Sequence, residues 1–293
     1  MVMGSYIMNM TKTLLYLAKE PDDGVISDLE SFSNYDITVC ACNPGYVDYY
    51  KLLGYNVITH HKFFTTVDMR FDTVIGNPPY QSGKNSNFYV EFIKHAAKLT
   101  KEGGIVSLII PNRFILPHTP AAKSLRECYQ VEQLIVDVNN HFPGVGTNIG
   151  MFKARVSSTG HHGDVDVVLS GGDTIQWDFV SPLIPSRKPT LDGVNEWREL
   201  MVKNNYNIVS KQPTDTDQFV YVCRQWKTKG GVPYFDAHVG PSGDKRDGKY
   251  ILTTKPQELC EFLRSTDLAG KIHKLFGDQM NIWPFLWDYL PII

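Results

Sequence analysis

The residues with the clearest chemical potential are Asn77, Pro78, Pro79 and Tyr80, which directly follow an apolar run from Phe71 to Gly76. An amine attached to an aromatic ring is a poor nucleophile because its lone pair is delocalised. Hydrogen-bond acceptors for both of its N–H groups, here the side-chain oxygen of Asn77 and the carbonyl oxygen of Pro78, would draw the nitrogen towards tetrahedral geometry. The prolines fix the loop without adding a competing N–H donor. The ring of Tyr80 offers a flat surface on which an aromatic base can stack.

An alternation of strand-like and helix-like segments must position this loop. From Thr13 to about Val156 the pattern is typical of a mainly parallel sheet covered by helices. In such sheets ligands bind beyond the carboxyl ends of the strands, which is where Asn77 lies. The seven expected strands are Thr13–Glu20, Ile37–Cys42, Asn56–His60, Phe71–Gly76, Ile105–Ile110, Val131–Val138 and Asn148–Val156.

The loop could also be an ordinary turn at the end of a strand, since Asn and Pro dominate turns of every kind. Its surroundings favour the functional interpretation. An apolar strand precedes it, and an amphipathic helix is expected from about Asn87 to Thr100, where Gly103 and Gly104 follow.

With these elements in place, the chain resembles the gamma-class N6-adenine DNA methyltransferases of the TaqI type, and the related adenine-methylase domains of restriction-modification systems. The resemblance covers about residues 13–156. It implies a class I, Rossmann-like methyltransferase fold, S-adenosylmethionine as cofactor, and DNA as the partner in which an adenine is flipped out and methylated at N6. The motifs that carry it, in the family's order, are Asn77–Tyr80, Asn87–Phe92, Leu99–Gly104, Pro111–Phe114 and Asn140–Thr147.

The same resemblance implies roles for two phenylalanines. Phe142 would stack on the flipped adenine opposite Tyr80, and Phe92 would lie near the adenine of the cofactor. A Phe on the apolar face of a helix is usually a core residue, so the position of Phe92 is equally well explained by packing. Phe142 lies between His141 and Pro143 in an expected loop, which favours the binding role.

The family's first cofactor motif is a strand that ends in an acid, often followed by Pro, and then a turn of small residues and glycine. Glu20, Pro21 and Gly24 are the candidates for it, in a compressed form with two aspartates between Pro21 and Gly24. The glycine would let the methionine part of the cofactor approach the backbone. A plain acidic turn would produce the same letters.

The next two cofactor motifs depart from the family's pattern. Ala41 stands where the family places the acid that binds both ribose hydroxyls, so Asn43 would have to substitute for it with an uncharged amide oxygen. Lys62, or His61 on a different alignment, stands where an aspartate would bind the amine of the cofactor's adenine. A lysine can only donate, so it cannot hold that amine.

These departures leave alternatives open beside a DNA adenine methyltransferase that binds S-adenosylmethionine weakly or through other groups. One is a catalytically inactive relative that binds DNA or a partner protein. Another is a methyltransferase that acts on a protein glutamine or on RNA, because the Asn-Pro-Pro-Tyr loop also suits a side-chain amide. No metal site is expected, because His60 and His61 are adjacent in a predicted strand and would point to opposite faces.

The chain is expected to have two parts, a methyltransferase-like catalytic domain over residues 1–156 and a smaller α+β region over residues 157–293. The second part lies where the family carries its target-recognition region. Only residues 256–276 look firmly helical there. Cations near aromatic residues could hold DNA phosphates, although neutralising aspartates make a plain solvated surface an equal alternative. The candidate DNA-binding residues are Lys227, Lys229, Lys245 and Arg246.

Composition limits the other possibilities. The 293 residues are 42% hydrophobic and 20% charged, typical of a globular protein, and the formal net charge of −2 restricts any DNA contact to a local patch. The five cysteines form no metal-binding or disulfide pattern, which favours a reducing cytoplasm. No signal peptide or membrane span is expected. Whether a nuclease subunit accompanies the chain does not follow from these residues.

Overall fold

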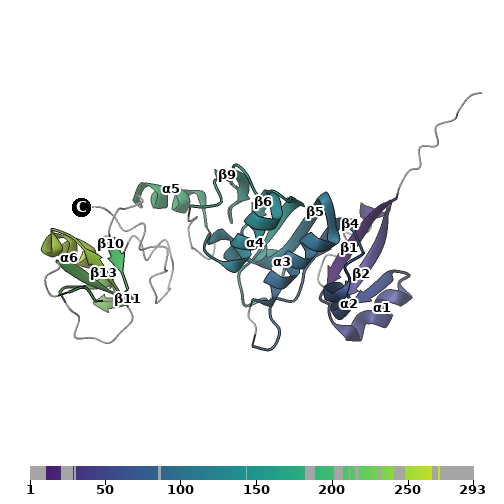
Figure 1. The fold of residues 1–293 in the computed structure, drawn as a ribbon, viewed down its shortest axis with the longest axis horizontal. Coiled ribbons are helices and arrows are strands. Elements are labelled where there is room, and N and C mark those ends of the chain that lie inside the picture. Colours follow the sequence, from purple (N-terminus) through teal and green to yellow (C-terminus); the bar gives the residue numbers. More distant parts are fainter. Residues whose placement is uncertain are drawn as a thin grey trace, which may run out of the picture. The chain divides into compact units, whose positions relative to one another are not determined.

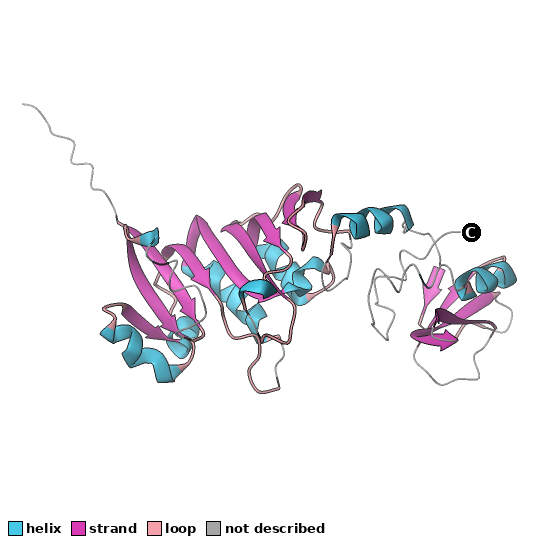
Figure 2. Ribbon diagram, turned by 180° about the vertical axis from the view of Figure 1, so that it is seen from behind, coloured by secondary structure: helices cyan, strands magenta, loops and turns pink. Residues whose placement is uncertain are grey.

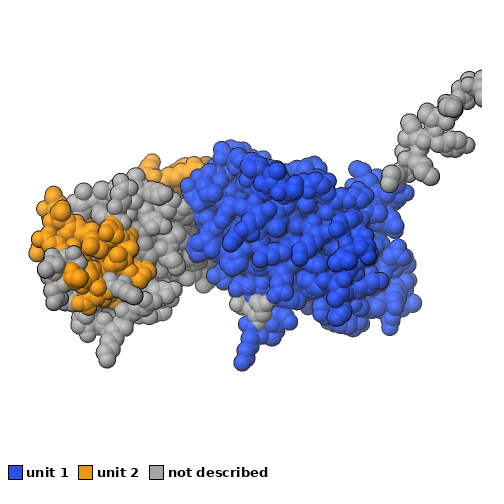
Figure 3. Space-filling view, viewed as in Figure 1, with its two compact units in different colours: residues 1–181 blue, residues 182–293 orange. Residues whose placement is uncertain are grey.

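The computed structural model describes residues 11–20, 29, 31–84, 87–142, 144–181, 189–200, 207–210, 212–214, 218–229, 232–240, 248–265 and 270. The chain divides into two compact units, residues 1–181 and 182–293 (Figure 3). Each unit has its own sheet.

The first unit is built on a nine-stranded sheet with the order β3-β2-β1-β4-β5-β7-β6-β8-β9. Neighbouring strands from β3 to β5 are parallel, whereas β7 runs antiparallel to both of its neighbours, β5 and β6. The seven expected strands are all present, and their order with an antiparallel β7 is that of a class I methyltransferase. The strands are β1 Lys12–Ala18, β2 Tyr35–Ala41, β3 Asn56–Thr59, β4 Phe71–Gly76, β5 Thr100–Pro111, β6 Tyr129–Ile135, β7 Ile149–Val156, β8 Val165–Val168 and β9 Thr174–Trp177.

Helices connect the strands and cover the sheet. The helix α3 has buried residues at helical spacing, including Tyr89, Phe92 and Ala96, and this apolar stripe faces the sheet. Figure 1 shows α3 and α4 in front of the sheet, and Figure 2, seen from behind, shows the sheet in front of them. The helices of this unit are α1 Val47–Leu52, α2 His60–Thr65, α3 Phe88–Leu99 and α4 Pro120–Cys128, with shorter 3-10 helices at Pro44–Tyr46, Asn112–Ile115 and Asn139–His141.

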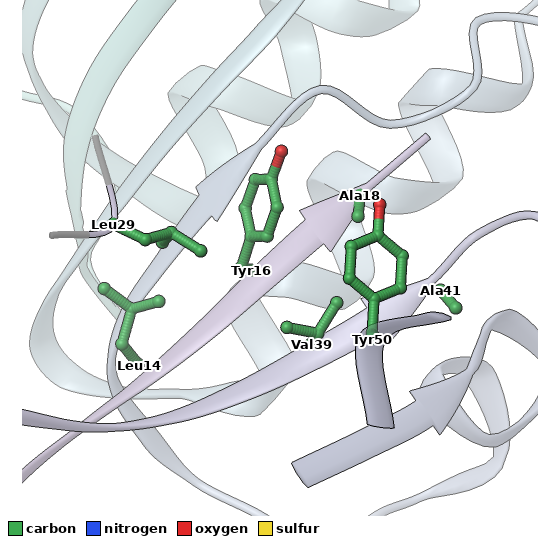
Figure 4. Packing of buried hydrophobic residues seen from close by; sticks show 7 residues of the cluster. All are labelled: Leu14, Tyr16, Ala18, Leu29, Val39, Ala41 and Tyr50. Atoms are coloured by element: carbon green, nitrogen blue, oxygen red, sulfur yellow. The ribbon is translucent and has the colours of Figure 1, made fainter. Parts of the chain in front are cut away.

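The strand β1 lies at the centre of the core and is buried on both faces. Leu14, Tyr16 and Ala18 stand on one face, and Leu15 and Leu17 on the other, all at most 1% exposed. Full burial of a large apolar side chain stabilises a fold by roughly 1.5–3 kcal/mol. The cluster on the first face is shown in Figure 4 and consists of Leu14, Tyr16, Ala18, Leu29, Val39, Ala41 and Tyr50.

Two expectations for this unit are corrected. The sheet does not end near residue 156, because β8 pairs in parallel with β6 and β9 continues from β8, so the compact unit runs to residue 181. In addition, His60 and His61 begin the helix α2, since Thr59 caps it by accepting a hydrogen bond from the Lys62 N–H. The argument from strand geometry against a shared metal ligand therefore does not apply to these two histidines.

The second unit contains a four-stranded antiparallel sheet with the order β10-β13-β11-β12, and the helix α6 packs on it. The smaller α+β region is thus confirmed. The described part of the expected helix 256–276 is α6, and residues 266–269 and 271–276 lie outside the described residues. None of the helices in the described part of the chain is long and apolar enough to cross a membrane. The elements are α5 Leu191–Leu200, β10 Asn207–Val209, β11 Phe219–Lys229, β12 Val232–Val239, β13 Gly248–Leu252 and α6 Pro256–Arg264.

Candidate active site

The backbone at the end of β4 brings Asn77 close to the neighbouring strand β1. Gly76 has a φ of +142°, and a Cβ atom built on it would lie 2.3 Å from the carbonyl oxygen of Leu17. The N–H of Asn77 donates to that same oxygen at 3.0 Å. Only a glycine lets the two strands approach this closely at the carboxyl edge of the sheet.

The side chain of Asn77 is buried, with 6% of its surface exposed. Its Oδ1 atom is inaccessible and has no hydrogen-bond partner among the described residues. A buried acceptor without a partner costs a fold about 1–3 kcal/mol. Native structures retain few such atoms, and functional sites are one place where they occur. This oxygen is therefore available to a donor that the fold itself does not supply.

A cavity of about 660 Å³ opens beside the loop that follows Asn77. Its size is within the range of pockets that enclose small organic ligands. The residues come from segments far apart in the sequence that meet at the carboxyl edge of the sheet. They are Lys19 after β1, Pro79, Tyr80 and Gln81 after β4, Tyr89 on α3, Pro111 and Arg113 at the end of β5, and Gly146 and Thr147 before β7.

The sequence argument anticipated Pro79 and Tyr80 in this cavity but did not single out Lys19, Tyr89, Arg113 or Thr147 as site residues. A signal for two of them was available, because Lys19 directly follows β1, and Arg113 is the second residue after β5, at the edge where ligands bind. Burial raises the pKa of the Tyr89 hydroxyl, and the positive charge of Arg113 acts in the opposite direction. The wall of the cavity is therefore partly cationic.

The segment that carries Arg113 is held rigidly. The buried Asn112 donates from Nδ2 to the carbonyl oxygen of Val136 at 2.9 Å, and its N–H donates to Asn148 at 3.0 Å. The hydroxyl of Thr119 donates to the carbonyl oxygen of Arg113 at 2.9 Å. These bonds fix the backbone of Arg113 while its side chain remains exposed.

Phe142 is half-buried in the segment between β6 and β7. Its N–H donates to the carbonyl oxygen of Asn139, which closes a short 3-10 turn. Gly146 and Thr147 from the same segment line the cavity, whereas Phe142 is not among the residues that contact it. Stacking of Phe142 on a base stays a prediction.

The residues that were predicted to bind the cofactor, Glu20, Pro21, Gly24, Ala41 and Asn43, are arranged differently from the Asn77 loop. Glu20 is exposed and forms an ion pair with Lys19, with 3.6 Å between Nζ and Oε1. Pro21 and Gly24 lie outside the described residues. Asn43 caps the 3-10 helix Pro44–Tyr46, and its Oδ1 accepts the N–H of Gly45 at 3.0 Å.

Ala41 is completely buried in the core cluster beside Ala18 and Tyr50. Of positions 41, 43 and 62, only Asn43 carries a side-chain acceptor. Its amide oxygen keeps a second lone pair. These positions thus fit S-adenosylmethionine weakly, with one uncharged acceptor for the ribose.

Lys62 lies exposed on α2 and Phe92 is completely buried on α3. The Phe92 ring stacks on Phe63 with centroids 5.1 Å apart and planes at 21°, and it meets Phe64 and Phe88 edge-on. As it lies, Phe92 is enclosed by these aromatic rings and presents no surface to the cavity. A direct contact with the cofactor stays a prediction.

The candidate DNA-binding residues fall in the second unit. Lys227 and Lys229 are in β11, but their side chains are not among those described, and Lys245 and Arg246 lie outside the described residues. Their role stays a prediction.

The strand order, the antiparallel β7 and the Asn-Pro-Pro-Tyr loop at the end of β4 define the class of the first unit, a class I methyltransferase. Residues 8–141 match the model of the Eco57I restriction-modification methylase family. The methylase-like segment is therefore similar to that family over slightly less than half of the chain, which confirms the resemblance. No curated protein matches the chain in sequence.

Solved structures that are similar to part of this chain share little sequence with it. The methyltransferase subunit of a type I restriction-modification system from Streptococcus thermophilus is 16% identical, with a TM-score of 0.43 over 58% of this chain and 46% of that one. The type IIG restriction endonuclease BpuSI is 12% identical, with a TM-score of 0.47 over 70% and 34%. A methyltransferase from Pyrococcus furiosus is 20% identical, with a TM-score of 0.37 over 51% and 75%. The chain thus spans less than half the length of the two restriction-modification proteins.

Proposed function

We propose that the chain transfers the methyl group of S-adenosylmethionine to N6 of an adenine that is flipped out of DNA. The observation that carries this proposal is the buried Oδ1 atom of Asn77, which has no partner among the described residues and belongs to the loop whose later residues, Pro79 and Tyr80, line the cavity. An exocyclic amine is a donor of the kind that this oxygen lacks. The family match of residues 8–141 supports DNA as the substrate.

The residues of the loop would do most of the work on the base. Asn77 Oδ1 and the carbonyl oxygen of Pro78 accept the two N–H groups of N6, which directs the nitrogen lone pair out of the ring plane. Tyr80 stacks on one face of the adenine, and Phe142 closes on the other face when the base enters. No general base is needed before transfer, because the amine loses its proton afterwards to solvent.

S-adenosylmethionine supplies an electrophilic methyl group when it is bound. Asn43 would accept a hydrogen bond from a ribose hydroxyl, and Glu20 lies at the end of β1 where the methionine part of the cofactor is expected. Because Asn43 is uncharged and already caps a turn, we expect this binding to be weak.

A second candidate function is favoured by one observation. Ala41 is buried in the core cluster and cannot contact a ribose. The same arrangement at this position is expected of a methyltransferase-like chain that no longer binds the cofactor. Such a chain would bind DNA or another subunit of a restriction-modification system without methylating anything.

The deciding experiment offers tritiated S-adenosylmethionine to the full-length protein with duplex DNA, single-stranded DNA, RNA and a protein extract as separate acceptors. We expect label in DNA, recovered as N6-methyladenine after digestion, and incorporation that is slower by about 10²–10³-fold with Asn77→Ala. Label in a protein amide or in RNA would replace the substrate. No label in any acceptor, together with retained DNA binding, would favour the non-catalytic relative.

A further inference from the structure

The charge of the cavity is not explained by the chemistry at Asn77. Its described lining residues include two cations, Lys19 and Arg113, and no acid. Lys19 is partly neutralised by Glu20 at 3.6 Å. For Arg113, no carboxylate of a described residue lies within 4.0 Å of the guanidinium, and the side chain is exposed. In a protein with a formal net charge of −2, a cavity-lining cation without a carboxylate partner among the described residues favours the binding of an anion.

The position of Arg113 is fixed before any ligand arrives. Asn112 and Thr119 hold its backbone on both sides, as described above, so only the side-chain rotamers remain to be ordered on binding. Its charge also reaches the cavity wall. It opposes the effect of burial on the pKa of Tyr89, and it adds to the effect of burial in lowering the pKa of His118.

A neutral base carries no anionic group that Arg113 could bind, whereas a nucleotide carries a phosphate. When an adenine stands with N6 at Asn77 and its ring on Tyr80, its sugar and phosphates must leave the cavity towards the DNA backbone. A guanidinium presents a planar fork of donors that matches two phosphate oxygens at once. The volume of about 660 Å³ accommodates a ligand larger than a base.

We infer that Arg113 binds a phosphate of the nucleotide whose base enters the cavity, so that the site takes a whole adenine nucleotide and not the base alone. This inference rests on the proposed function for the identity of the base. It makes Arg113 a binding residue that acts before chemistry, by holding the flipped nucleotide in place.

The test uses small probes, so that it does not depend on a recognition sequence. Binding of deoxyadenosine and of its 5′- and 3′-monophosphates to the full chain is measured by ligand-observed NMR. The variants are Arg113→Gln, Arg113→Lys and the matched control Arg70→Gln. Arg70 is also exposed but directly precedes β4, at the opposite edge of the sheet from Asn77.

For the wild type we expect one monophosphate to bind about tenfold more tightly than deoxyadenosine, the factor that corresponds to roughly 1.4 kcal/mol. Arg113→Gln should reduce this preference to less than about twofold, Arg113→Lys should leave part of it, and Arg70→Gln should leave it unchanged. Thermal unfolding of Arg113→Gln should match that of the wild type because the side chain is exposed.

Three results would overturn the inference: no preference for a monophosphate in the wild type, an unchanged preference in Arg113→Gln, or a loss of S-adenosylmethionine binding in Arg113→Gln with nucleotide binding intact. The last result would assign Arg113 to the cofactor's carboxylate. A phosphate preference that depends on Arg113 in a chain that methylates nothing would uphold the inference while the proposed function fails.

Discussion

The carboxyl edge of the sheet has two sides, the proposed base side at Asn77 and the proposed cofactor side at Ala41 and Asn43, and the hydrogen-bonding states of their polar atoms are opposite. On the base side, the Oδ1 atom of Asn77 is buried and has no partner among the described residues. On the cofactor side, the Oδ1 atom of Asn43 caps a turn, and Ala41 has become part of the core. A buried acceptor without a partner lowers stability and can serve a ligand, whereas a capping acceptor already contributes to the fold. The base side is therefore the part of the site that the fold alone does not account for.

The largest expected effect is a difference in the rate of methyl transfer between variants of Asn77 and of Asn43. Asn77→Ala should lower the rate of methyl transfer by about 10²–10³-fold, as the loss of a preorganised transition-state hydrogen bond does elsewhere. Its free energy of unfolding should stay within about 1 kcal/mol of the wild type, because the removed oxygen has no internal partner.

Asn43→Ala is the matched variant on the cofactor side. It should lose about 0.5–1 kcal/mol of stability with its cap, and less than about tenfold in rate. Urea unfolding and single-turnover methyl transfer measure both quantities for each variant. Equal losses of rate in the two variants would contradict the comparison.

A second pair of variants tests the backbone under the base side. Gly76→Ala places a methyl group 2.3 Å from the Leu17 carbonyl oxygen in a region of φ that side chains avoid, and should cost about 2–5 kcal/mol. Gly83→Ala also has a positive φ, +56°, but no atom lies within 4 Å of the added carbon, so it should cost about 1 kcal/mol. Urea denaturation gives both values. A Gly76→Ala protein as stable as Gly83→Ala would show that β1 and β4 can separate at this edge.

One substitution, Asn43→Asp, should increase the affinity of the chain for S-adenosylmethionine. Asn43→Asp keeps the cap, because Asp and Asn cap helices equally well, and replaces a neutral acceptor with a charged one. We expect S-adenosylmethionine to bind about three- to tenfold more tightly in calorimetric titration. Unchanged affinity would mean that the ribose does not lie at Asn43.

The smallest effect concerns the opposite edge of the sheet. Lys101 and Thr13 lower the pKa of Asp72 from 3.8 to about 2, with Lys101 Nζ 2.7 Å from Oδ1. The carboxylate thus contributes stability that is present above about pH 4 and is lost as the pH falls towards 2. Since the side chain is partly exposed, Asp72→Asn should cost about 0.5–1 kcal/mol at neutral pH.

This cost should shrink as urea unfolding is repeated at lower pH, and methyl transfer at neutral pH should not change. A loss of methyl transfer in Asp72→Asn would contradict this expectation, because it would show that the edge of the sheet at Asp72 influences the cavity near Asn77.

The sequence was most informative where one segment decides the structure alone. The strand Phe71–Gly76 was predicted with its observed bounds, because Arg70 and the Asn-Pro-Pro loop delimit a single apolar run. By contrast, β8 and β9 are strands of four residues between glycine-rich turns, and only the free edge of β6 makes them part of the sheet. The same limit applies to the site. Asn77 and Tyr80 were predicted from one loop, whereas the place of Arg113 beside them depends on which strands are neighbours.

The antiparallel course of β7 has a consequence for how such a site can change. Because β6 and β7 are antiparallel, the segment from residue 136 to residue 148 begins and ends at the same edge of the sheet. Its residues Gly146 and Thr147 line the cavity. Asn139 closes its base by donating to the Thr147 carbonyl oxygen at 2.8 Å and accepting the Ile149 N–H at 3.0 Å. Doubling the length of a closed loop costs only about 0.6 kcal/mol. Insertions in this segment would therefore change the border of the cavity at Gly146 and Thr147 at a small cost in loop-closure entropy, without altering β4.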